Sequence, residues 1–305
     1  MPSEQTFTIG YVSQQTGVAS VTLRAWERRY GLIKPQRTPK GHRVYNQDNI
    51  EQIQHILSWL NRGVAISKVP KLLTSEKAPS VIVSTDEQWV SQQNDLLAAI
   101  AELKQRRLDQ LLDRLNKATP FITLSEQVYQ PLHAVLIKRW QQQPLGYQLE
   151  QKVWQQSWQR QTLLMTLRTD KQKAQGECYL AGMDIDGPTL NYYFLHILLL
   201  QNGIRVNAFN TVDDLADLTR LSNNSELPLM IFADQRVEQT TFNQLSKLSN
   251  FWQESIICVG RMSDIHHQQL TNLALVFAGG STSNCWQSDE MTAWLKKIKQ
   301  SCRNS

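Results

Sequence analysis

The sequence predicts a multi-domain protein in which an all-α winged helix-turn-helix head precedes a helical bundle and an α/β doubly wound parallel sheet. Three features indicate this: two short helix patterns followed by a basic, proline-punctuated stretch, a long helix-compatible region, and apolar β-rich runs separated by helix-length segments. A chain of 305 residues favours two or three domains. We place the head at residues 6–75, a linker at 76–86, the bundle at 87–172 and the α/β domain at 173–305.

The head begins with two short helices. The segment "TIGYVSQQTG" suits a helix that Gly17 closes, and Ser20 suits the N-cap of a second helix, "VTLRAWERRY", which Gly31 ends. Because only "TGVAS" joins them, the two helices are expected to form a helix-turn-helix.

A wing and a longer helix are expected next. Proline and glycine break the helical pattern of "LIKPQRTPKGHRVY", which favours two short strands around a tight turn. A helix then begins at Asn46 or Asp48 and is closed by Gly63, and a short helix, "ISKVPKLL", ends the head. The apolar face of the longer helix holds Ile50, Ile53, Ile56, Leu57 and Leu60.

The rest of the chain changes its hydrophobic period once. From Glu87 to about Asp170 leucine and isoleucine recur at helical spacing, and breaks at "TPF" and "QPLG" indicate about four helices. Five short apolar runs follow: "ECYLAGM", "IRVNAF", "PLMIFAD", "ESIICVG" and "LALVFAGG". Such strands, alternating with helices, predict a parallel sheet covered on both faces, with any ligand beyond the carboxyl ends of the strands.

Positive charge is concentrated in the head. The net charge is +5, yet residues 1–75 alone hold ten Lys and Arg against four Asp and Glu. Between Thr22 and Asn46 the only acidic residue is Glu27. Because unpaired charges are not buried readily, this excess predicts a surface for nucleic acid.

The second helix and the wing hold the candidate DNA contacts. A helix-turn-helix places its second helix in the major groove, while flanking basic groups hold phosphates. Thr22, Arg24 and Arg28 fall on successive turns, and we expect Thr22 and Arg24 closest to the duplex. Some arginines could instead pair with acids or cover the helix surface. The wing residues expected to contact the backbone are Arg37, Lys40, His42, Arg43 and Tyr45.

The sequence gives little support for a metal-binding, redox or membrane function. The four cysteines form no C-x-x-C pair, and Cys178 and Cys258 lie in apolar runs as small hydrophobes. The start "MPSEQTFTIG" has no signal pattern, and the run "YYFLHILLL" is too short to span a bilayer. We therefore expect a cytoplasmic protein without membrane contact or metal. The scattered histidines expected at the surface are His133, His196, His266 and His267.

The head resembles a known family along the full length of its DNA-binding domain. "TIGYVSQQTGVASVTLRAWERRYGLIKPQRTPKGHRVYNQDNIEQIQHI" is similar to the winged helix-turn-helix of MerR regulators, and Ala25-Trp26-Glu27 resembles the subgroup of MlrA-type regulators and light-responsive, cobalamin-binding repressors. The resemblance implies a transcription regulator, activator or repressor, that binds palindromic double-stranded promoter DNA as a homodimer. It also implies that the bound DNA is distorted, which changes how RNA polymerase meets the promoter.

The C-terminal half is similar to the cobalamin-binding module of those repressors. In that family a histidine after the first strand ligates cobalt, but the aligned segment "DGPTLN" has Pro188 there, and proline offers no donor atom. Gln151 replaces a second histidine. The resemblance therefore implies a degenerate effector domain without a cofactor, whose vestigial positions are Trp140, Glu150, Asp186, Gly279 and Gly280.

Several functions remain open for this C-terminal half. It would receive a signal from a small molecule or from a partner protein. A cobalamin-dependent, light-responsive repressor is an alternative. An enzyme using Asp184 and Asp186 is another, although no nucleophile and base accompany them. A third is a protein-docking surface formed by the former ligand crevice or by the aromatic cluster Trp140, Trp154 and Trp158.

Overall fold

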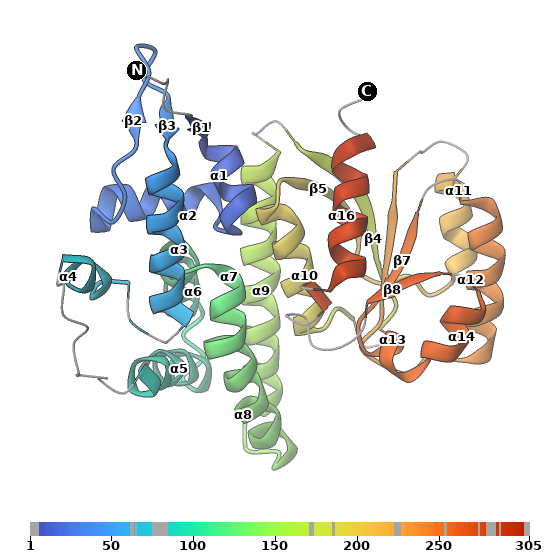
Figure 1. Cartoon of the computed structure of the whole chain (residues 1–305). Helices are drawn as coiled ribbons and strands as arrows, with labels where there is room; N and C mark the ends of the chain where they lie inside the picture. The colour runs from blue at the N-terminus through green and yellow to red at the C-terminus, as the bar shows by residue number, and fades with distance from the viewer. Residues whose placement is uncertain are drawn as a thin grey trace. The chain divides into compact units, whose positions relative to one another are not determined.

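A computed structural model of the chain divides into two compact units, Met1–Ser157 and Trp158–Ser305 (Figure 1). The expected linker lies outside the described residues except for positions 85 and 86, which begin a helix. The structure describes residues 6–61, 64, 66–74, 85–170, 174–184, 187–222, 227–252, 255–273, 275–278, 285–286 and 288–301.

The first unit opens with helices around a small antiparallel sheet. Its strands pair in the order β1-β3-β2, with β2 and β3 forming a hairpin. They are β1 (Phe7–Thr8), β2 (Gln36–Arg37) and β3 (Arg43–Tyr45). The helical elements are α1 (Ile9–Thr16), α2 (Ser20–Ala25), the π-helical turn η1 (Trp26–Tyr30), α3 (Gln47–Asn61) and α4 (Val69–Thr74).

Local signals set the helix ends in this region. Gly17 and Gly31 end the first two helices in the left-handed conformation, with φ of 69° and 60°, as predicted. The N-cap prediction for Ser20 is wrong, because Ala19 occupies that position. The carbonyl oxygen of Ala19 accepts from the N–H groups of Thr22 and Leu23, so Ser20 is already helical.

The remaining helices of the first unit pack on one another. Helix α5 contacts α6, η2 and α8, and α6 also contacts α2 (Figure 1). Helix α9 begins in the first unit and continues into the second. These elements are α5 (Thr85–Ala101), α6 (Gln105–Ala118), α7 (Phe121–Leu124), η2 (Ser125–Tyr129), α8 (Gln130–Gln141) and α9 (Tyr147–Thr169).

The core of the head includes a residue from α6. Val12, Leu23, Trp26 and Tyr45 are fully buried together, and Ala118 of α6 belongs to the same cluster. The indole N–H of Trp26 donates to the carbonyl oxygen of Ala118 at 2.9 Å. The head is therefore packed against the helical region that follows it in sequence.

The second unit is a parallel sheet with helices on both faces. Its strands lie in the order β5-β4-β6-β7-β8, and each predicted apolar run contains one of them. Strands β6 and β7 are buried along their whole length. The strands are β4 (Gly176–Gly182), β5 (Ile204–Phe209), β6 (Leu229–Phe232), β7 (Ile256–Val259) and β8 (Val276–Ala278).

Helices connect and cover these strands (Figure 1). Helix α10 is buried from Leu190 to Leu200, whereas α16 contacts β4 and β8. Apart from α10 (Leu190–Gln201), the helical elements are η3 (Leu215–Leu218), α11 (Thr219–Ser222), α12 (Gln239–Phe251), α13 (Arg261–Ile265), α14 (His267–Asn272) and α16 (Asp289–Ser301).

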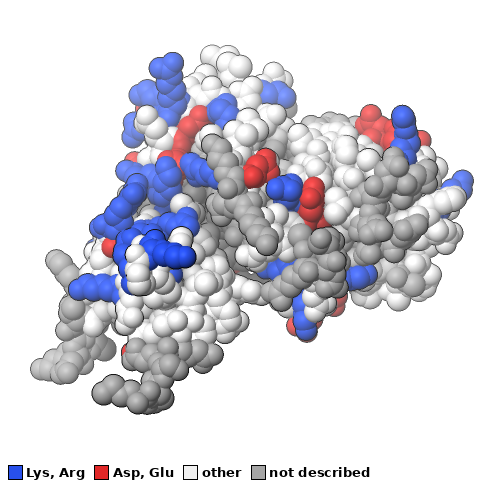
Figure 2. All heavy atoms as spheres, turned by 90° about the horizontal axis from the view of Figure 1, so that it is seen from above, with Lys and Arg blue, Asp and Glu red and all other residues white. Residues whose placement is uncertain are grey.

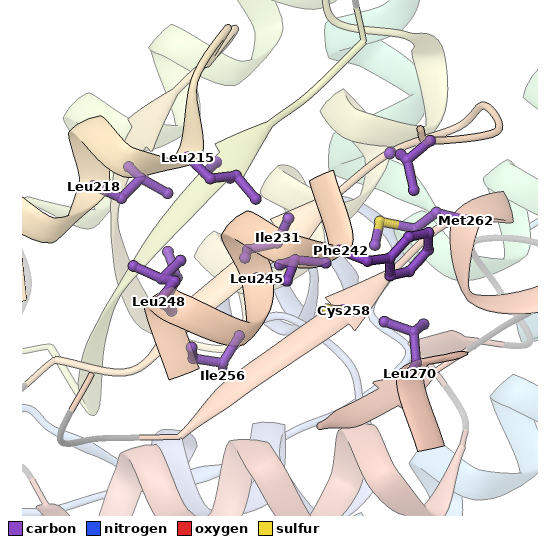
Figure 3. Close-up of a cluster of buried hydrophobic side chains, with 14 of the residues drawn as sticks. Leu215, Leu218, Ile231, Phe242, Leu245, Leu248, Ile256, Cys258, Met262 and Leu270 are labelled. Carbon is purple, nitrogen blue, oxygen red and sulfur yellow. The ribbon is translucent and has the colours of Figure 1, made fainter. Parts of the chain in front are cut away.

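One face of this sheet is closed by a large apolar cluster. Figure 3 shows Leu245 of α12 beside Ile231, with Leu248, Cys258 and Met262 in the same cluster. Cys178 and Cys258 are fully buried, as expected for small hydrophobes. The cluster therefore fastens α12, η3 and α14 to the sheet by burial of apolar surface.

Two of the four histidines expected at the surface are buried. His196 is 6% exposed and lies in the apolar helix α10. His266 is 5% exposed, and its Nε2 accepts from the N–H of Val237 at 3.2 Å. The surface prediction is wrong for both residues. His196 lies in a helix that is apolar on nearly all sides, and His266 accepts a buried hydrogen bond from the backbone N–H of Val237.

Candidate nucleic-acid interface

Basic side chains gather over the first unit. In Figure 2, Lys and Arg cover much of the N-terminal unit with few Asp and Glu among them. Figure 2 therefore agrees with the charge asymmetry of the sequence, because residues 1–75 contain ten Lys and Arg but only four Asp and Glu.

Three arginines project from the second helix of the helix-turn-helix. Arg24 of α2 and Arg28 and Arg29 of η1 are all exposed. Within the described part of the chain none of the three forms an ion pair. Because a guanidinium binds phosphate or the edge of guanine through paired donors, these side chains are available for DNA.

The hairpin is fastened to this helix by one carboxylate. Glu27 accepts from Arg37 Nη2 at 3.3 Å through Oε1 and from Arg43 Nε at 2.5 Å through Oε2. The hydrogen bond to Glu27 raises the pKa of the Arg43 guanidinium. These two arginines therefore follow the alternative interpretation of the sequence, in which an acid orients them, while Arg37 stays 54% exposed.

Two predicted contact residues lie in the interior instead. Thr22 is 1% exposed and Tyr45 is fully buried, and burial raises the pKa of the Tyr45 hydroxyl. Neither is placed to touch DNA, which corrects the expectation for both. Helical spacing alone does not show which side of α2 is buried, because α2 also contacts α6, which lies far away in the sequence.

The hairpin turn carries the remaining candidates. Lys40 and His42 are exposed between β2 and β3, and the N–H of His42 donates to the hydroxyl of Thr38 at 3.1 Å. The backbone of the turn is therefore ordered locally. DNA contact by Arg24, Arg28, Arg37, Lys40, His42 and Arg43 stays a prediction.

A basic groove lies along the exposed side of the second helix. It has a volume of about 410 Å³. The sequence reasoning missed two of its residues: Arg29, which continues the basic run of the helix, and Lys117, for which the head sequence gives no signal. The groove is lined by Val21, Arg24, Ala25, Arg28, Arg29, Arg43 and Lys117.

The crevice beyond the carboxyl ends of β4 and β6 is closed by hydrogen bonds. Asn191 Nδ2 donates to Asp234 Oδ2 at 2.8 Å, and the N–H of Asp234 donates to Asp184 Oδ1 at 2.9 Å. The pocket beside them holds about 10 Å³, roughly one water. Asp184 thus supports a loop, which is a structural role.

The residues of this crevice do not fit a cobalt-ligating cofactor. Pro188 has no donor atom, and no group of metal-ligating side chains occurs among the described residues. Burial raises the pKa of the neighbouring Cys285 thiol to about 12, so the thiolate is disfavoured. The vestigial positions Asp186, Gly279 and Gly280 lie outside the described residues.

Trp140 and Glu150, the two bundle residues that match the cobalamin-binding relatives, are hydrogen-bonded to each other. Trp140 is 8% exposed and its indole N–H donates to Glu150 Oε2 at 2.9 Å. Arg139 donates to both carboxylate oxygens of Glu150. Trp140, Trp154 and Trp158 are all buried, so the expectation of an indole docking surface is wrong.

Comparison with known proteins assigns the head to a class. Residues 7–76 match the family model described as MerR HTH family regulatory protein. This range covers the helix-turn-helix, the hairpin, α3 and α4. The head therefore belongs to the MerR family of helix-turn-helix transcription regulators.

Two relatives make the likeness more specific. The HTH-type transcriptional regulator MlrA of Escherichia coli is 38% identical over 126 residues, which are 41% of this chain and 50% of that protein. The HTH-type transcriptional repressor CarH of Myxococcus xanthus is 31% identical over 150 residues, 46% of this chain and 49% of that protein. The chain spans about half the length of these curated relatives.

A solved structure shows a weaker likeness. The methanol:cobalamin methyltransferase complex MtaBC from Methanosarcina barkeri is 13% identical, with a TM-score of 0.33, over 76% of this chain and 96% of that chain. A likeness at this level carries no argument about function. Separately, no helix among the described residues is long and apolar enough to cross a membrane.

Proposed function

We propose that the protein is a sequence-specific transcription regulator that binds palindromic promoter DNA as a homodimer and distorts it. The observation that carries the proposal is a set of three exposed arginines, Arg24, Arg28 and Arg29, on the second helix of a MerR-type domain, none of which forms an ion pair with another described residue. A neutral or paired surface would give no reason to expect a polyanion there.

Each group has a distinct role in this proposal. Arg24 enters the major groove and reads a base edge, while Arg28 and Arg29 hold phosphates of the flanking backbone. The hairpin, fixed by Glu27, brings Arg37, Lys40, His42 and Arg43 to the adjacent backbone. Bending the duplex costs a few kcal/mol, which these contacts offset, and the altered promoter shape changes how RNA polymerase engages it.

The C-terminal unit would be the part that receives the signal. The described part of its crevice is narrowed by the hydrogen bonds of Asn191 and Asp184 with Asp234, which favours a partner protein or a ligand at another surface. A cobalamin-dependent repressor is the second candidate because of the resemblance of the domain order. Incubation with cobalamin followed by gel filtration tests it: stoichiometric corrin absorbance in the protein peak would favour this candidate.

DNA binding is tested with the full chain. Genomic fragments that co-purify with the protein give a candidate site, and fluorescence anisotropy compares this site with a scrambled duplex at several salt concentrations. Arg24→Ala is expected to lower specific affinity by about 1–3 kcal/mol if Arg24 touches a base, and to reduce the salt slope by about one if it touches phosphate. Equal affinity for both duplexes at moderate salt would contradict the proposal.

A further inference from the structure

The end of α6 is held against the second helix of the head. The buried hydrogen bond from Trp26 to Ala118 fixes the backbone of residue 118, and Ala118 packs in the core of the head. Its neighbour Lys117 therefore has a defined place beside α2. The matched family domain ends at residue 76, so Lys117 lies outside it.

Lys117 completes a groove lined by positive charge. Three of the five cations come from the second helix, Arg43 comes from β3, and Lys117 comes from α6. Like charges placed this close repel one another, and an anion in the groove would relieve that repulsion. The apolar side chains of Val21 and Ala25 leave the guanidinium and ammonium groups as the polar partners of such an anion.

Lys117 is held by a local ion pair. Its ammonium contacts the carboxylate of Asp113 one turn earlier, and the lysine side chain is 31% exposed. A partly exposed pair at i, i+4 contributes modestly to stability, so replacing the carboxylate by a DNA phosphate costs little free energy. The ammonium, a compact charge with three donors, suits a phosphate oxygen.

We propose that Lys117 is a DNA-backbone contact, so that helix α6 extends the DNA interface beyond the MerR-type domain. The proposal rests on the proposed function, because the ligand is the same duplex. A phosphate of the DNA backbone is favoured over a free small anion because the groove continues the exposed side of α2, where Arg24 and Arg28 meet the duplex.

The test measures how the affinity of the full chain for its site depends on salt. Lys117→Gln is expected to weaken binding about five- to ten-fold near 0.1 M salt and to lower the slope of log K against log salt by about one. Lys117→Arg keeps the charge and is expected to keep the slope. Lys104→Gln is the matched control, because it removes a lysine at the other end of α6, where Lys104 is 56% exposed.

A fourth variant separates a DNA contact from a purely helical role. Asp113→Asn removes the carboxylate that pairs with Lys117, so the affinity for DNA should stay the same or increase. If the pair only stabilises the helix, Lys117→Gln and Asp113→Asn should weaken DNA binding to the same extent. Thermal unfolding by circular dichroism verifies that each variant is folded.

The outcomes distinguish this proposal from the proposed function. If Lys117→Gln keeps the wild-type slope while Arg24→Ala loses affinity, the Lys117 proposal is wrong and DNA binding stands. If the wild-type chain does not prefer its site, the proposed function itself fails. Weakened binding of tripolyphosphate in calorimetry, with unchanged DNA binding, would assign the groove to small anions and overturn the proposal.

Discussion

Trp26 and Ala118, 92 positions apart in sequence, are joined by a buried hydrogen bond of 2.9 Å between an indole N–H and a backbone carbonyl. The bond links the second helix of the DNA-binding head to α6 of the helical region. The residue that gives the subgroup its Ala-Trp-Glu sequence is therefore a packing and hydrogen-bonding residue, while the neighbouring Arg24 and Arg28 remain exposed.

Replacing Trp26 with Phe should destabilise the first unit by about 1–3 kcal/mol, because the carbonyl of Ala118 would lose its donor in a buried place. Urea denaturation monitored by circular dichroism gives the free energy of unfolding. Trp89→Phe is the matched control: Trp89 is 4% exposed and its indole N–H has no partner among the described residues. Equal losses in the two variants would contradict the role of the bond.

A fragment of residues 1–75 should unfold at a lower temperature than a fragment of residues 1–157. The shorter fragment lacks Ala118 and exposes part of the apolar surface around Leu23 and Trp26, which α6 covers in the whole chain. Thermal melts of both fragments give the comparison. An equally high midpoint for the shorter fragment would show that the head is complete without α6.

Glu27→Gln should reduce discrimination between the cognate site and a scrambled duplex several-fold. The variant loses the charge that orients Arg37 and Arg43, and the half-buried bond to Arg43 is the stronger of the two because the Arg37 side chain is 54% exposed. Non-specific affinity should rise, because one acidic group leaves the surface.

Glu51→Gln is the control for Glu27→Gln. It changes the net charge equally on the exposed face of α3, where Glu51 accepts a 3.4 Å hydrogen bond from Gln47. If both variants change discrimination alike, the effect comes from net charge and the proposed orienting role of Glu27 is wrong.

His196 should make the second unit less stable as the pH falls. Burial lowers the pKa of His196 from 6.5 to about 4 in the folded state. Between these values the unfolded chain binds a proton that the folded chain excludes, so the free energy of unfolding decreases as the pH drops through this window, by up to about 3 kcal/mol.

The measurement for His196 is the urea midpoint at pH 7 and at pH 5. His196→Leu should flatten the dependence, because it removes the titrating group from an apolar helix. His55→Gln, at an exposed position of α3, should leave the dependence as it is. A wild-type dependence that persists in His196→Leu would assign the pH effect to carboxylates.

Local chemistry made much of the fold predictable. Gly17 and Gly31 end the first two helices through their own backbone conformation, which depends only on neighbouring residues. The strands of the second unit are recognisable in the sequence as short apolar runs. His196 was also predictable in principle, because every neighbour in "YYFLHILLL" is apolar or aromatic. The glycine helix ends and the positions of the strands thus follow from interactions that the sequence displays directly, whereas the order of the strands in the sheet does not.

The interface was predictable only in part. The exposed positions of Arg24 and Arg28 follow from helical spacing, whereas the burial of Thr22 depends on tertiary packing that the local sequence does not display. Tyr45 was assigned to the surface with the basic residues of the hairpin, yet it is the buried residue of β3 and belongs to the core of the head. Lys117 could not be found, because its place in the groove depends on a tertiary contact.

The closure of the head by Ala118 also has a consequence during synthesis. Residues up to about 75 leave the ribosome while the stretch that covers Trp26 has still to be translated. At ~5–20 residues per second, the roughly forty intervening residues take about 2–9 s. For that interval the nascent domain presents an open apolar edge, and a chaperone with affinity for exposed indole would meet it there.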